Sequence, residues 1–369
     1  MAPLNQEVIR SLASFKGGDR PVVSVYLDVD GSRWPRFSDC DSRLERMVRQ
    51  GAERAGRPDA ADDLGRIVGH VRSGVDRNRV RGVAAFACGD RLWEVFELPV
   101  RVKDQVVVNQ TAHVRQLERV VDTYRGFGVL LADRQRARMF VYELNELVDK
   151  SELFDELPRH DDEAGDRDRG HERNHLEAAA RQHLKRAAQL GFEVWKQHPF
   201  DHLILAAAPE LIHELEGALH SYLKGRVAAR INLPAGASDA EITAAATEVE
   251  QQVERDREAA VVARLRSAAA AGRGAVVGLQ PVLSALGERR VDTLVVSDGY
   301  EAPGWRCQAC GHLAAKGPAC GVCGQEMTLV DDVIEEAVED ALLQSCHVEM
   351  CVDNADLDVV GRLGALLRF

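Results

Sequence analysis

The sequence lacks several features that would assign the chain to a membrane or to general nucleic-acid binding. It has no apolar run near the roughly 20 residues that span a bilayer, and its N-terminus has no apolar signal core. It has no excess of basic residues, because 47 Lys and Arg residues are outnumbered by 59 Asp and Glu residues, which gives a formal net charge of −12. Internal repeats are also missing. We expect a cytoplasmic monomer with no membrane or DNA partner.

Composition and length indicate an ordinary globular protein of more than one domain. Hydrophobic residues make up 45% of the 369 positions and charged residues 29%. At about 150 residues per domain, this length predicts two or three domains. Strand and helix patterns alternate along the chain, and they predict three mixed α/β domains over residues 1–120, 121–235 and 236–369.

The first domain, 1–120, is predicted from a β-rich run and a hairpin. The run Val22–Leu27 follows Pro21, and two helical stretches come next, at 40–56 and 60–75. Strands at 82–88 and 92–98 are joined at Gly89-Asp90, which is a strong hairpin signal.

The central domain, 121–235, begins with a second predicted hairpin, of strands 127–133 and 137–142. The stretch 155–173 is too polar to bury a core, and we expect a mobile loop there. A helix over 172–196, a strand at 203–205, a helix opened by Pro209 and a strand at 226–231 should complete the domain.

The third domain, 236–369, starts with a capping box. In Ser238-Asp239-Ala240-Glu241 the serine and the glutamate can each bond the other's backbone N–H, so a helix should run to about 270. A second helix is expected at 275–287 and a strand at 291–297. A helix at 333–342 and strands at 347–352 and 364–368 follow.

Four cysteines predict a closed metal site in an insertion at 304–326. Two Cys-x-x-Cys pairs lie nine residues apart, and a glycine follows each pair; the ligands would be Cys307, Cys310, Cys320 and Cys323. Four thiolates at this spacing suit a tetrahedral, structural Zn²⁺ with no open position for water. Disulfides or free thiols are the alternatives, and spacing alone does not separate zinc from iron. The other cysteines, among them Cys40, are interpreted as packing residues.

A second motif indicates a different chemistry. His171-Glu172-Arg173-Asn174-His175 matches His-Glu-x-x-His, the helix on which metalloproteases hold zinc, and Glu193 could supply a third ligand. The polar flanks offer little of the dry shell that such a site needs, and Arg173 would place a cation beside the metal. Exposed residues in the first turn of a helix are the favoured interpretation.

The order of elements in the second and third domains resembles the archaeal and eukaryotic peptide release factor and Pelota superfamily. The resemblance is carried by Gly126–Asp133 and by Arg290–Val296. It is closest to the bacterial branch, and the ending Gly364–Phe369 is similar to Balon-like ribosome hibernation factors. It implies a central domain whose loop reaches the peptidyl transferase centre, and a C-terminal domain related to an RNA-binding ribosomal-protein fold with a zinc-knuckle insertion.

The resemblance implies binding to the ribosome rather than catalysis. Release factors of this superfamily carry Gly-Gly-Gln before the long helix of the central domain, where this chain has Asp168-Arg169-Gly170-His171-Glu172-Arg173. An Asn-Ile-Lys-Ser codon-reading motif is also missing. We expect a factor without catalytic residues that occupies the tRNA site of stalled or hibernating ribosomes, with elongation factor Tu as a possible partner. Residues expected to contact ribosomal RNA are Arg167, Arg169, Gly170, His171 and Arg173.

Two other functions remain open from the sequence. One is a peptidyl-tRNA hydrolase for ribosome rescue with a divergent loop, in which His171 and Glu172 would be needed for turnover. The other is a zinc-stabilised RNA-binding or adaptor protein that never enters the decoding site.

Overall fold

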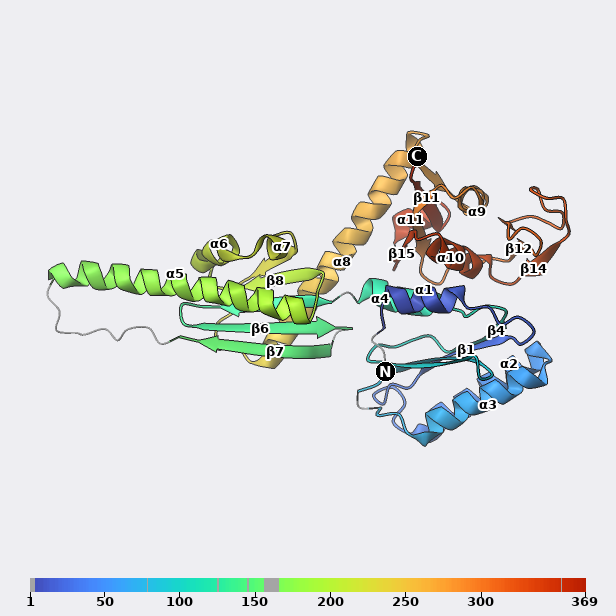
Figure 1. Cartoon of the computed structure of the whole chain (residues 1–369), viewed down its shortest axis with the longest axis horizontal. Helices are drawn as coiled ribbons and strands as arrows, with labels where there is room; N and C mark the ends of the chain where they lie inside the picture. Colours follow the sequence, from blue (N-terminus) through green and yellow to red (C-terminus); the bar gives the residue numbers. More distant parts are fainter. Residues whose placement is uncertain (1–3, 78, 125, 145, 156–165, 353) are drawn as a thin grey trace. The chain divides into compact units, whose positions relative to one another are not determined.

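The computed structural model forms two compact units, Met1–Thr123 with Arg257–Phe369, and Tyr124–Asp256. It describes all residues except 1–3, 78, 125, 145, 156–165 and 353, and the side chains of Arg54 and residues 166–176 are also outside the description. The chain passes from one unit to the other after Thr123 and again inside helix α8 (Asp239–Ala270), which is labelled in Figure 1. The mixed α/β class is confirmed, and the division into three domains stays a prediction. Among the described helices, none has the length and apolarity to span a membrane.

The N-terminal part of the first unit is built on an antiparallel four-stranded sheet in the order β3-β2-β1-β4. Its strands are β1 (Val22–Asp28), β2 (Gly82–Cys88), β3 (Leu92–Leu98) and β4 (Gln105–Asn109), and its helices are α1 (Gln6–Ser14), α2 (Phe37–Ala55), α3 (Pro58–Ser73) and α4 (Arg115–Thr123). Side chains of β1 and β2 form one core with Leu44 of α2 and Leu64 of α3. The β2–β3 hairpin is confirmed, and Gly89 adopts a φ of 56° in its turn.

The C-terminal part of the same unit has a four-stranded sheet in the order β10-β16-β11-β15. The strands are β10 (Ala275–Val277), β11 (Val291–Ser297), β15 (His347–Cys351) and β16 (Leu363–Leu367), with helices α9 (Leu279–Gly287), α10 (Val333–Leu343) and α11 (Ala355–Val359). The sequence predicted a helix over 275–287, and the start of this prediction is wrong. Residues 275–277 pair with β16, and Gly278, with a φ of 86°, separates them from α9.

A third, small sheet in this unit carries the cysteines. It has the order β13-β12-β14, with β12 (Gly304–Cys307), β13 (Leu313–Ala314) and β14 (Met327–Val330). Both pairings are antiparallel.

The second unit is a mixed five-stranded sheet in the order β7-β6-β5-β8-β9. Its strands are β5 (Phe127–Ala132), β6 (Arg136–Glu143), β7 (Glu146–Phe154), β8 (His202–Ala206) and β9 (Val227–Ile231), and its helices are α5 (Asp166–Gln197), α6 (Pro209–Ala218) and α7 (Ser221–Lys224). The β5–β6 hairpin is confirmed, while β8 and β9 add in parallel. The capping box at the start of α8 is also confirmed, because Glu241 accepts the Ser238 N–H at 2.8 Å.

Helix α5 begins earlier than the sequence predicted. Residues 166–173 were expected in a mobile loop but are helical, and the rest of that stretch, 156–165, lies outside the described residues. Arginine and glutamate are good helix formers, and a helix already nucleated by packing extends at little cost. The packed segment is the C-terminal part, from which Leu184, Ala187 and Val194 enter the core. Figure 1 shows the first turns of α5 extending past the strands of its own unit.

Candidate metal centre

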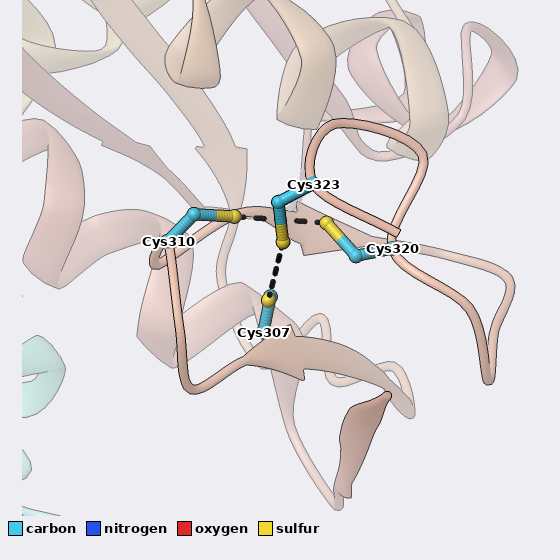
Figure 2. A group of neighbouring side chains, drawn as sticks. All are labelled: Cys307, Cys310, Cys320 and Cys323. Carbon is cyan, nitrogen blue, oxygen red and sulfur yellow. Dashed lines mark hydrogen bonds between the residues drawn. The ribbon is translucent and has the colours of Figure 1, made fainter. Parts of the chain in front are cut away.

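The four predicted cysteines converge on one point at one end of β12. Their sulfur atoms all lie within 4.8 Å of one another. Cys307 Sγ is 3.4 Å from Cys323 Sγ, and Cys310 Sγ is 3.6 Å from Cys320 Sγ (Figure 2). A tetrahedral ion with Zn–S bonds of about 2.3 Å needs sulfurs about 3.8 Å apart. The four side chains therefore fit a metal ion of that size.

Two knuckles with the same backbone geometry present these sulfurs. The N–H of Gly311 donates to the carbonyl of Cys307 at 2.8 Å, and the N–H of Gly324 donates to that of Cys320 at 2.9 Å. These glycines have φ values of 76° and 74°, a conformation that residues with a Cβ rarely adopt. The glycine after each pair thus closes the turn that brings both thiols to one side.

Backbone amides already stabilise thiolates in both knuckles. The N–H of Cys310 is the largest influence that lowers the pKa of Cys307. In the second knuckle the N–H of Cys323 does the same for Cys320, whose pKa falls to about 6. The His312 N–H lowers the pKa of Cys310, but burial and the neighbouring thiols outweigh it and raise that pKa to about 12. Four adjacent thiols cannot all ionise without a cation, and a divalent ion would remove this opposition.

The insertion has almost no core other than the cysteines. Its buried cluster is Cys307, Ala314, Cys320 and Met327, with Trp305 packed at the edge. Two of these four residues are the proposed ligands. A Cβ on Gly317 would lie 2.2 Å from the Trp305 ring, so this small core leaves no room for a larger residue there. So small a core cannot hold the segment folded without help from a ligand.

A second group of metal-ligating types was not predicted from the sequence. His202 begins β8, and Glu250 and Glu254 lie one turn apart on α8. His202 Nδ1 is 2.7 Å from Glu250 Oε1 and 3.9 Å from Glu254 Oε1. The shorter distance is that of a hydrogen bond between imidazole and carboxylate, which needs no metal, although Glu250 Oε2 has no hydrogen-bond partner among the described residues. His202 and Glu250 are 48 positions apart in the sequence, so no short motif could have predicted that they meet.

The His-Glu-x-x-His motif and the residues expected to contact RNA all lie in the first turns of α5. The backbone of Arg167, Arg169, Gly170, His171 and Arg173 is helical, and their side chains lie outside the described residues. The same holds for Glu172 and His175, so both site predictions stay predictions. Glu193 bonds Lys196 and Gln189. Buried His183 has its Nδ1 2.5 Å from Asp155 Oδ2, while its Nε2 has no hydrogen-bond partner among the described residues.

A cluster of four stacked rings, on α5 and at the start of α7, is a further surface that sequence analysis missed. Phe192 lies 3.9 Å from His220 between ring centroids, and Trp195 lies 5.9 Å from Tyr222. Neighbouring ring planes are within 6° to 17° of parallel. About 25 residues separate the two pairs in sequence, so no periodic pattern joins them.

Comparison with solved structures gives weak whole-chain matches. The archaeal translation termination factor aRF1 is 16% identical, with 98% of this chain and 96% of that chain covered and a TM-score of 0.27. Pelota of Archaeoglobus fulgidus is 14% identical, with 78% and 79% covered and a TM-score of 0.32. S. cerevisiae Dom34, described as a translation termination-like factor, is 10% identical, with 75% and 73% covered and a TM-score of 0.43. At these scores no residue is transferred between the chains.

No curated protein matches the chain, but a family model does. Residues 113–251, which include the whole sheet of the second unit and α5, match bacterial archaeo-eukaryotic release factor family 10. This match confirms the superfamily that the strand sequence Gly126–Asp133 indicated. The likeness to the bacterial release factors therefore covers residues 113–251, which is less than half of the chain.

Proposed function

We propose that the chain is a ribosome-binding translation factor that occupies the tRNA site of stalled or hibernating ribosomes without hydrolysing peptidyl-tRNA. The observation that carries this proposal is the match of residues 113–251 to a bacterial release-factor family. The ribosome, through its RNA, is then the partner, and elongation factor Tu is the candidate for delivery.

The first turns of α5 are the segment proposed to contact ribosomal RNA. A helix of 32 residues is about 48 Å long, whereas the longest strand of its sheet, β7, has 9 residues and spans roughly 30 Å. The helix must therefore extend past the sheet at the end that carries Arg167, Arg169 and Arg173. Arginine contacts to phosphate would fix its position without reading a base sequence.

Loss of hydrolysis is proposed from the same segment. The superfamily's Gly-Gly-Gln chemistry depends on a small turn whose backbone is exposed to the ester. Gly170 lies inside α5, four residues after its start at Asp166, where a helix uses the backbone N–H for its own bonds. A hydrolase that depends on His171 and Glu172 would lose turnover in the H171A/E172Q double variant, while the factor proposed here would show no turnover before or after the change.

The metal centre is proposed to be a structural zinc site. Four thiolates leave no ligand position for water or substrate, so the ion would order the insertion rather than take part in chemistry.

Sedimentation through sucrose gradients tests the proposal. Purified protein is mixed with vacant ribosomes at low and physiological salt, with and without elongation factor Tu. We expect comigration that persists at physiological salt and is lost when residues 160–175 are deleted. Failure of the intact chain to comigrate in every condition would contradict the proposal and favour an adaptor that binds elsewhere.

A further inference from the structure

We propose that the ring cluster of Phe192, Trp195, His220 and Tyr222 is a stacking platform for an unpaired nucleobase of single-stranded RNA. The stacking is argued from the rings alone. That the nucleic acid is RNA rests on the proposed function.

The rings offer a flat, accessible π-surface. The four planes are nearly parallel, with 6° between His220 and Tyr222 and 16° between Phe192 and His220. Tyr222 is 60% exposed, and His220 is also exposed. A ring that only completes a core is buried, whereas these two residues are exposed to solvent. Every base has a π-face, and stacking on an aromatic ring is the general mode of single-strand recognition.

The platform is held in place before any ligand arrives. Phe192 and Trp195 pack against the core of the unit, and the Trp195 indole N–H donates to the Phe200 carbonyl at 3.2 Å. His220 Nδ1 accepts the backbone N–H of Tyr222 at 3.4 Å, which orients the imidazole. Little side-chain entropy remains to be lost on binding, so stacking energy is retained as affinity.

Charges around the platform suit a phosphate backbone. Arg226 lies over the Trp195 ring at 4.7 Å, and Lys196, which pairs with Glu193, lies over the Phe192 ring at 5.3 Å. The acidic side chains nearby already have cations, because Glu193 pairs with Lys196 and Glu216 with Arg230.

Arg226 and one further cation, Lys224, donate to carbonyl oxygens. Arg226 donates to the Tyr222 carbonyl at 2.8 Å, and Lys224 donates to the Gly217 carbonyl at 2.9 Å. Lys224 also acts electrostatically on Glu216, so Arg226 is the cation that we assign to a phosphate. Exposed rings beside positive charge favour a nucleotide over an apolar peptide segment.

Fluorescence anisotropy with a labelled single-stranded RNA of about ten nucleotides tests the platform on the full chain at low salt. Removing one stacked ring by Tyr222→Ala should weaken binding roughly 5- to 100-fold, and Tyr222→Phe should restore it. Because this side chain is exposed, thermal unfolding should be unchanged. Phe369→Ala, which removes an 80% exposed ring that stacks on no ring of the described residues, is the matched control.

Arg226→Gln separates the phosphate contact from stacking. It keeps a donor for the Tyr222 carbonyl but removes the charge, so the salt slope of RNA binding should fall by about 0.7 for one lost contact. Binding of single-stranded DNA and of duplex RNA of the same length shows which kind of nucleic acid supplies the stacked base. We expect the duplex to bind worse because its bases are already stacked.

The platform and the ribosome proposal can fail separately. RNA affinity that depends on Tyr222 supports the platform even if the chain never comigrates with ribosomes. Equal affinity of wild type and Tyr222→Ala, or no binding of the oligonucleotide at low salt, would overturn the platform while the sedimentation result stands by itself. A preference for single-stranded DNA over RNA would overturn the assignment to RNA.

Discussion

Two buried glutamates on α10 link the stability of the first unit to pH. Burial raises the pKa of Glu339 to about 7, although Thr111 and Arg306 partly oppose it. Burial likewise raises the pKa of Glu335 to about 7. Glu335 Oε1 accepts the Val114 N–H at 2.8 Å just before α4. Since the folded chain binds more protons than the unfolded chain between about pH 4.5 and 7, each glutamate lowers stability as pH rises through this range.

Glu339→Gln should therefore stabilise the protein at alkaline pH. The neutral amide avoids the cost of a buried charge, and we expect a gain of roughly 2–3 kcal/mol at pH 8.5 and little change at pH 4.5. Urea unfolding at the two pH values measures the difference. Burial lowers the pKa of His113 to about 4, which acts in the opposite direction, but this contribution cancels between variant and wild type. Exposed Glu53→Gln is the control, and equal gains at both pH values would contradict the assignment.

At the scale of elements, the cysteine insertion should depend on its metal while the surrounding sheets do not. We expect one zinc per chain by metal analysis, and loss of that zinc in Cys310→Ser. Without the ion the four-residue core cannot hold β12, β13 and β14 together, so limited proteolysis should cut within 304–330 and leave the rest intact. Cys40→Ala, at a buried cysteine outside the cluster, should keep the zinc. Visible absorbance with equimolar iron would indicate an iron site instead.

Elements set by adjacent residues could be predicted from the sequence, whereas those set by distant partners could not. The Gly89-Asp90 hairpin and the Ser238–Glu241 capping box are local signals, and both are present. The cysteine cluster was predictable for the same reason. Strand β7 was missed because its edge position leaves a polar, alternating sequence with no apolar run. The ring platform was missed because only the fold brings α5 beside α7.

At the scale of the whole molecule, net charge constrains how the chain can bind RNA. A formal charge of −12 opposes a broad electrostatic attachment, so the proposed affinity for ribosomes would have to come from a few localised contacts. Localised contacts give a shallow dependence of affinity on salt, because each phosphate contact adds only about 0.7 to 0.9 to the slope of log K against log salt.

The triple variant R167Q/R169Q/R173Q should therefore reduce the salt slope of ribosome binding by about 2, since three arginine contacts would be lost. The slope is obtained by measuring ribosome affinity at salt concentrations from about 50 to 200 mM. R10Q/R264Q/R273Q removes three exposed arginines elsewhere and changes the net charge equally. If both triples lower the slope alike, total charge rather than the start of α5 governs binding, and the proposed role of that helix is wrong. If only the first triple does, the contact lies where α5 extends past its sheet.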